Sequence, residues 1–201
     1  MAYTPLKLLT FEEFVQHYSD QTQYELANGE LIDREPTGLH EAVAGKVASK
    51  VSLEIARQNL PFLIPKSCIL RPSGDEATAR RPDVIVLDEA ALVDEPYWNQ
   101  EPVIVRGQSV KLVVEVVSTN WENDYARKVE EYALMGIAEY WIVDFCELGG
   151  IRFIGDPKQP TFTVNQRVGK LYEQQQFRLG EAIVSLLFPN LILKLDDVLP
   201  R

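Results

Sequence analysis

The chain of 201 residues is long enough to bury a sizeable core, and its 46% hydrophobic and 25% charged residues are typical of a globular protein. No run approaches the roughly 20 apolar residues that span a bilayer, so we expect no membrane segment. The N-terminus lacks a signal-peptide pattern, and the two cysteines, Cys68 and Cys146, do not suggest a disulfide framework. We therefore expect a cytoplasmic protein. The net charge of −10 argues against a broad, non-specific surface for nucleic acid but leaves room for a local site.

The first third of the chain predicts two helices around a hairpin. Thr10, followed by acids, is typical of a helix N-cap and predicts a short helix to about Ser19. Asn28-Gly29 between short alternating runs predicts a β-hairpin. Apolar residues recur at helical spacing over 39–59, which predicts the first long helix.

The middle of the chain predicts buried strands separated by polar connections. A second helix is expected from Asn123 to Met135, with Gly136 at the position that commonly ends a helix. The three most apolar runs are expected to be strands, at 84–87, 111–117 and 139–144. The remaining segments are expected to be extended or looped: 63–66, 68–71, a polar loop at 75–78, and a long acidic connection at 88–108.

The C-terminal third is expected to be rich in strands. Its candidate strands are 151–154, 161–164, 171–177, 182–186 and 191–195. One helix before the strands and another among them predict a mixed α/β fold, and we expect the chain 1–201 to form a single domain.

Two carboxylates inside strand-like runs are the strongest chemical signal. Asp83 follows Pro82 at the start of one valine-rich run, and Glu115 lies within another. A buried carboxylate is costly unless something satisfies it, and Mg²⁺ favours such oxygen ligands. Lys128 on the following helix lies one turn from Asp124 and one turn from Tyr132, so the three share a face. A lysine beside a metal can orient water and neutralise developing charge, which indicates phosphodiester chemistry.

Pro82-Asp83 followed by Glu115-Val116-Val117 resembles the PD-(D/E)xK signature of restriction-endonuclease-like nucleases. Val117 occupies the place of the usual lysine, and Lys128 is the natural replacement. The migrated lysine resembles the Uma-two family, formerly domain-of-unknown-function family 820. The further blocks that carry this resemblance are Tyr24-Glu25-Leu26, Gly29-Glu30-Leu31, Pro36 and His40, Arg81-Pro82-Asp83-Val84, Val113 to Ser118, Asp124 with Lys128 and Tyr132, and Gly136 with Glu139 to Asp144.

The resemblance implies a restriction-endonuclease-like core: a mixed central β-sheet flanked by helices, with an extra N-terminal hairpin and a β-rich C-terminal part. It also implies a metal-dependent endonuclease that hydrolyses phosphodiester bonds in nucleic acid, expected to be DNA, and a homodimer. Mg²⁺, with Mn²⁺ as a substitute, would be held by Asp83, Glu115 and the Val116 carbonyl. Lys128 would orient water and stabilise the phosphate, while Glu25 would support the metal site and His40 would act near the phosphate or the leaving group.

Structural interpretations of the same residues remain open. Asp83 could form a turn, Glu25 could be an ordinary hairpin acid, His40 could cap its helix, and Glu115 could simply pair with Lys128. The basic residues around the site could form a groove or be scattered on an acidic surface; they are Arg71, Arg80, Arg81, Lys111, Arg127 and Lys128.

Two other functions also remain open. One is a catalytically inactive binding module that keeps the nuclease fold, since a fold does not dictate function. The other is a metal-dependent hydrolase of a different phosphate ester.

Overall fold

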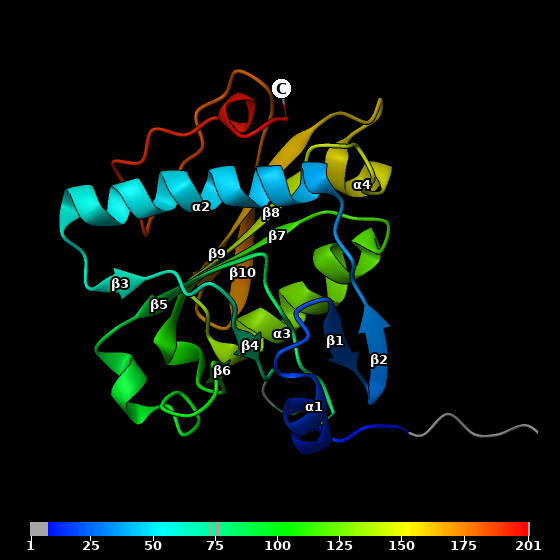
Figure 1. Cartoon of the computed structure of the whole chain (residues 1–201). Coiled ribbons are helices and arrows are strands. Elements are labelled where there is room, and N and C mark those ends of the chain that lie inside the picture. The colour runs from blue at the N-terminus through cyan, green and yellow to red at the C-terminus, as the bar shows by residue number, and fades with distance from the viewer. Residues whose placement is uncertain (1–7, 73, 75–76, 201) are drawn as a thin grey trace, which may run out of the picture.

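A six-stranded mixed sheet forms the centre of the protein in a computed structural model that describes residues 8–72, 74 and 77–200 (Figure 1). β7 and β8 are parallel, and the other neighbouring strands are antiparallel. Across the sheet the order is β10 (Leu171–Phe177), β9 (Thr161–Val168), β8 (Glu139–Asp144), β7 (Val110–Val116), β5 (Val84–Asp88) and β3 (Phe62–Leu63).

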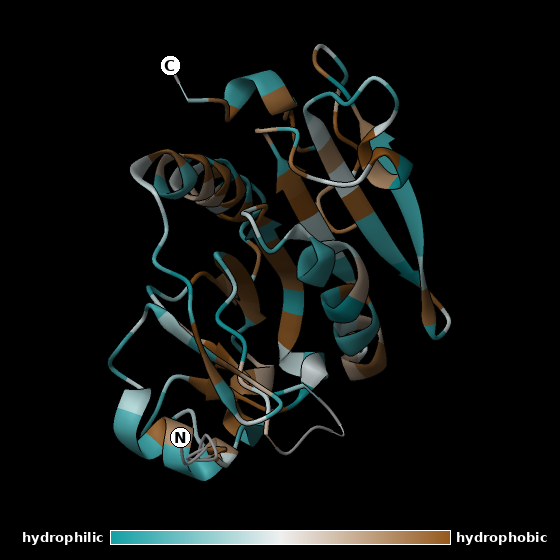
Figure 2. Cartoon of the chain, turned by 90° about the vertical axis from the view of Figure 1, so that its right-hand side faces the viewer, coloured by the Kyte–Doolittle hydropathy of each residue, from teal (hydrophilic) through white to brown (hydrophobic). Residues whose placement is uncertain are grey.

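Apolar layers cover both faces of the sheet, which explains why the central strands are mostly apolar on both of their faces (Figure 2). On one face lies α2 (Gly38–Gln58), whose Val43, Val47 and Val51 are buried as their spacing predicts. The C-terminal segment packs on the same face through Phe188 and Leu193, among others. Within the described residues, no helix is long and apolar enough to cross a membrane.

The opposite face is covered by α3 (Lys128–Met135), which continues from a π-helical turn, η3 (Asn123–Arg127). The helix expected from Asn123 to Met135 is therefore present, but its first turn is wider than an α-helical turn. π-turns of this kind occur frequently at functional sites. Gly136 ends the helix with φ 83°, as its place in the sequence predicts.

The N-terminal part forms a smaller layer beside the sheet. α1 (Phe11–Tyr18) has the predicted Thr10 cap, and β1 (Tyr24–Ala27) pairs with β2 (Glu30–Asp33). Asn28 and Gly29 turn between these strands with φ values of 52° and 81°, as the Asn-Gly signal predicts. Two short parallel strands, β4 (Ile69–Leu70) and β6 (Val103–Ile104), share this layer's core.

The connection 88–108 contains short elements that its sequence did not indicate. These are β6 and two 3₁₀ turns, η1 (Ala91–Asp94) and η2 (Gly107–Ser109). Of the polar loop expected at 75–78, Asp75 and Glu76 lie outside the described residues.

Three of the strand predictions for the C-terminal third are wrong. Residues 151–154 form a short helix, α4 (Ile151–Ile154), bounded by Gly150 and Gly155, because a short apolar run does not by itself distinguish helix from strand. Residues 182–186 and 191–195 pack irregularly, joined by an isolated bridge between Ala182 and Lys194, and the chain then forms a 3₁₀ turn, η4 (Leu195–Asp197). Their apolar side chains still enter the α2-side core.

A buried carboxylate on β8 holds part of this irregular segment against the sheet. Glu139 Oε1 accepts the main-chain N–H groups of Leu186 and Leu187 at 2.7 and 2.9 Å. Its Oε2 accepts Trp141 Nε1 at 2.9 Å and the Ser185 hydroxyl at 2.8 Å. Both oxygens of the side chain thus serve as acceptors, and three of the four partners are N–H groups that can only donate.

We therefore expect Glu139→Gln to destabilise the protein by about 3 kcal/mol, because the amide nitrogen cannot accept from the donors that it would face. Urea denaturation measures the change in the free energy of unfolding. The exposed Glu173→Gln on β10 is the matched control and should change it little. Equal stability of the two variants would contradict the proposed role of Glu139.

Candidate functional site

The register of β5 and β7 brings the two predicted carboxylates together. Val84 pairs with Val114, so Asp83 and Glu115 lie at the next position of the same antiparallel ladder. Asp83 Oδ2 accepts the Val116 N–H at 2.7 Å, which fixes the side chain against the end of β7. Asp83 is therefore more than a turn-forming acid: its carboxylate is held at the strand end beside Glu115.

Lys128 reaches Glu115 from the helix on the same side of the sheet. Its Nζ lies 3.0 Å from Glu115 Oε2 and 2.9 Å from Asp124 Oδ1. The Tyr132 hydroxyl donates to the other Glu115 oxygen at 2.8 Å. The predicted shared face of Asp124, Lys128 and Tyr132 is confirmed, and so is the internal Glu115–Lys128 ion pair that the sequence left open.

Arg34, immediately after β2, is a central residue of the site that the sequence did not reveal. Its Nη2 lies 3.2 Å from Asp83 Oδ1 and 3.5 Å from Glu115 Oε2. Its Nη1 donates to Glu25 Oε1 at 2.7 Å and also to the Arg81 carbonyl. A single guanidinium thus contacts three acids from three strands or strand ends.

His40 and Val116 meet at the start of α2. His40 Nε2 is 2.8 Å from the Val116 carbonyl oxygen and 3.4 Å from Asp83 Oδ2. The backbone N–H of His40, rather than its ring, contributes to the helix cap by donating to the Thr37 hydroxyl. The imidazole therefore contacts both the aspartate and the carbonyl that the sequence singled out as metal ligands.

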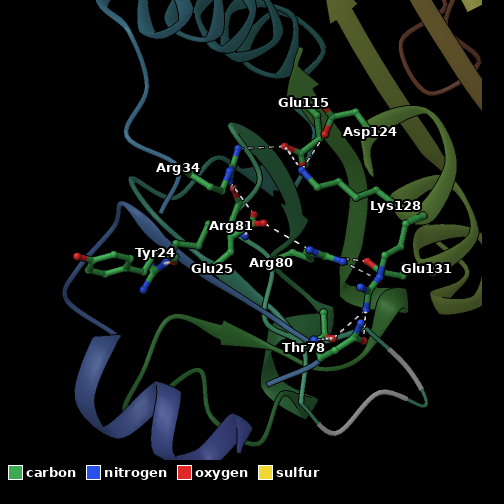
Figure 3. A network of polar contacts seen from close by, with 12 residues as sticks. Tyr24, Glu25, Arg34, Thr78, Arg80, Arg81, Glu115, Asp124, Lys128 and Glu131 are labelled. Carbon is green, nitrogen blue, oxygen red and sulfur yellow. Dashed lines mark hydrogen bonds and ion pairs between the residues drawn. The ribbon is translucent and has the colours of Figure 1, made fainter. Parts of the chain in front are cut away.

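Glu25 supports the site from β1 and connects it to the underside of α3 (Figure 3). Besides Arg34, its carboxylate accepts the Arg81 N–H at 2.7 Å and lies 3.6 Å from Arg80. Arg80 in turn makes a bidentate contact with the Glu131 carboxylate on α3, with hydrogen bonds of 2.8 and 2.7 Å. Glu25 is consequently a buried anchor of the ion-pair network, not an ordinary hairpin acid at the surface.

Burial and the neighbouring charges shift the pKa values of the site in different directions. Burial raises the pKa of Glu115 to about 7, with Asp83 and Asp124 adding to the increase and Lys128 and Arg34 opposing it. Burial alone would lower the pKa of Lys128, but Asp124 and Glu115 raise it above its ordinary value. Lys128 therefore stays protonated, and it can act as a cation and a donor but not as a base.

Each of the basic residues that bracket the site in sequence contacts an acid or a main-chain carbonyl. Arg81 donates its side chain to the carbonyls of Tyr24, Tyr18 and Ser19. The other pairs are Arg71 with Glu12, Arg80 with Glu131, Lys111 with Asp88, Arg127 with Glu131, and Lys128 with Glu115 and Asp124.

Two cavities open beside these residues. One, of about 370 Å³, lies at the carboxyl ends of the parallel strands β7 and β8 and is lined by Lys128, Asp124 and His40, among others. The other, of about 460 Å³, is lined by Asp83 and residues of the N-terminal layer. Crevices at the carboxyl ends of parallel strands are common ligand sites in α/β proteins.

A sequence model described as "Putative restriction endonuclease", Uma2, matches residues 11–196. The chain belongs to this family. A crystal structure of "a putative nuclease belonging to DUF820" from Anabaena variabilis ATCC 29413 is similar over 94% of this chain and 97% of that chain, with a TM-score of 0.67 and 18% identity. That likeness shows the shared fold. No curated protein matches the chain significantly.

Membership of the Uma2 family and the shared fold support a restriction-endonuclease-like nuclease, a class that usually uses a divalent metal. No three His, Cys, Asp or Glu side chains among the described residues form a ready metal cage. Mg²⁺, however, commonly takes only one or two carboxylates and keeps several waters. Such a partial set of oxygens is provided by Asp83, Glu115 and the Val116 carbonyl. These donors fit Mg²⁺ if Arg34 and His40 move away from the oxygens that they now contact.

Acid titration tests the role of Glu25. Burial would raise its pKa, but Arg34, Lys128, Arg80 and the Arg81 N–H together lower it to about 2, from an ordinary 4.5. The folded protein thus binds this proton more weakly than the unfolded chain. The resulting stability, about 3 kcal/mol, is present above about pH 4.5 and is lost as the pH falls toward 2.

We expect Glu25→Gln to be less stable than the wild type at pH 6, and this difference to disappear near pH 2. Chemical denaturation at a series of pH values measures it. Glu30→Gln, on the exposed part of the same hairpin, is the control. A wild-type advantage over Glu25→Gln that does not change with pH would contradict the ion-pair role.

Proposed function

We propose that this protein is a metal-dependent endonuclease that hydrolyses phosphodiester bonds in DNA. The observation that supports this most directly is the convergence of Asp83, Glu115 and Lys128 at one end of β7, from a strand start, a strand interior and a helix. A lone acid pair or a lone lysine would be an ordinary feature, whereas this combination within a nuclease family matches what phosphoryl chemistry needs.

Asp83, Glu115 and the Val116 carbonyl would hold Mg²⁺ or Mn²⁺. When bound, the ion would supply an activated water and stabilise the negative charge of the phosphate. Asp83 is already oriented by the Val116 N–H, and Glu115 by the Tyr132 hydroxyl. Asp83 Oδ1 and Glu115 Oε2 both contact Arg34, and Glu115 Oε2 also contacts Lys128.

Lys128 would act as the positive charge beside the scissile phosphate. Its raised pKa keeps the ammonium protonated at neutral pH, so its role is to orient water and to stabilise the charge that develops on the phosphate oxygens. Asp124 holds the ammonium in place at 2.9 Å. His40, within 3.4 Å of Asp83, would lie close enough to the metal side of the site to contact the phosphate or the leaving group.

The charge distribution favours local engagement of the substrate over broad electrostatic attraction. The net charge is −10, and the basic residues around the site form ion pairs within the protein, such as Arg80 with Glu131 and Lys128 with Glu115. A bound divalent ion would then be the main attraction for the phosphate. A duplex has two strands to cut, so we also expect two copies of the chain to act together.

The proposal predicts that one substitution abolishes metal binding and that another leaves it in place. Asp83→Asn should abolish both Mg²⁺ binding and cleavage, because a ligand is lost. Lys128→Met should lower the cleavage rate by at least about 100-fold while metal binding persists, because a charge-stabilising group is lost. Calorimetry measures metal binding, and a panel of plasmid, linear and single-stranded DNA and RNA measures cleavage.

Lys111→Met is the matched control, since Lys111 lies at the other end of β7 and pairs with Asp88. Removing Lys128 leaves two buried acids without their cation, so thermal unfolding must show that the variant is folded. Metal-dependent cleavage that survives Asp83→Asn would refute the assignment. Metal binding without cleavage of any nucleic acid would favour the binding module or a hydrolase of another phosphate ester.

A further inference from the structure

The guanidinium of Arg34 lies where the two candidate metal ligands converge. Nη2 contacts one oxygen of each carboxylate, Asp83 Oδ1 and Glu115 Oε2. An arginine here neutralises the same pair of charges that a divalent cation would neutralise. Both cations cannot occupy this position at once.

The contacts of Arg34 are unequal on its two sides. Nη1 is 2.7 Å from Glu25 Oε1, a length typical of a strong charge-assisted hydrogen bond. The contacts of Nη2 with Asp83 and Glu115 are longer, at 3.2 and 3.5 Å. The side chain is therefore held firmly by Glu25 and more loosely by the two candidate metal ligands.

Arg34 and Pro36 border both cavities. Lys128 and Asp124 line one of these cavities with Arg34, and Asp83 lines the other. The Arg34 side chain is 20% exposed, whereas that of Arg80 in the same network is 2% exposed, so Arg34 has an open path to solvent. Its backbone is fixed separately, since the Arg34 N–H donates to the Gln23 carbonyl at 2.7 Å.

We propose that Arg34 is a built-in competitor of the metal: it occupies the metal position in the metal-free protein and must leave Asp83 and Glu115 before a divalent ion binds. Its departure joins the two cavities into one cleft that reaches from Asp83 to Lys128. This inference rests on the proposed metal site. If the open state is populated at roughly 0.1–10%, the competition weakens the apparent metal affinity by about 10- to 1,000-fold.

The main test is metal binding by the full chain with Arg34→Met. We expect Mg²⁺ and Mn²⁺ to bind at least about tenfold more tightly to this variant than to the wild type, as measured by calorimetry. Arg34→Lys keeps the charge with a shorter reach and should fall between the two. Arg57→Met is the matched control, because Arg57 is exposed and pairs with Glu54 on α2. Unchanged or weaker metal binding by a folded Arg34→Met would overturn the proposal.

A second measurement uses the wild-type protein and does not depend on how the variants fold. Phenylglyoxal modifies accessible arginines, and mass spectrometry locates the products. Saturating Mg²⁺ should increase the modification rate of Arg34 several-fold, while that of the exposed Arg57 stays constant. An Arg34 rate that does not change with Mg²⁺ would show that the side chain keeps its place and would overturn the competition.

The two proposals fail in different ways. Tighter metal binding by Arg34→Met without cleavage of any nucleic acid by wild type or variant would support the competition and count against the nuclease. Metal-dependent DNA cleavage, with the same metal affinity in wild type and Arg34→Met, would support the nuclease and overturn the competition.

Discussion

Glu115 is a charged residue that is buried in β7, a central strand of the sheet. Burying a charge without partners costs several kcal/mol or more, so the fold must supply partners from its surroundings. Lys128 and Tyr132 reach it from α3, and Arg34 reaches it from the end of the N-terminal hairpin. The contacts that neutralise Glu115 therefore hold α3 and the end of the β1–β2 hairpin at the same end of β7.

Glu25 extends this arrangement away from the site. It meets Arg34 on one side and Arg80 on the other, and Arg80 continues to Glu131 on α3. Figure 3 shows that these pairs join β1, the segment before β5, and α3. A buried polar network of this kind is rigid only when its members are satisfied, and it stabilises less than an apolar core would. Its concentration beside a cleft is typical of a site whose geometry serves chemistry.

Local signals explain which parts of the fold and the site could be predicted. The Asn28-Gly29 hairpin, the valine spacing of α2 and the apolar central strands each have a mechanism that acts within a few residues. Asp83 and Glu115 could be paired because they lie in adjacent core strands. Arg34 could not be found in this way: it follows a strand end and contacts residues 49 and 81 positions away. The irregular C-terminal segment was also missed, since its apolar residues pack without a strand ladder and Glu139 takes two of its backbone N–H groups.

The geometry of β7 shows how a lysine elsewhere in the chain supplies the charge that Val117 does not. Side chains alternate along a strand, so Glu115 and Val117 point to the same face of the sheet. Val117 is 2% exposed and belongs to the apolar cluster that α3 covers together with Tyr132 and Met135. Val117 also borders the cavity that Asp124 and Lys128 line, so the position combines apolar packing with closeness to the site. Lys128 descends onto the same face from the covering helix and places its ammonium 3.0 Å from Glu115. The charge is kept on the correct face of the sheet, while the strand position remains apolar and available for packing.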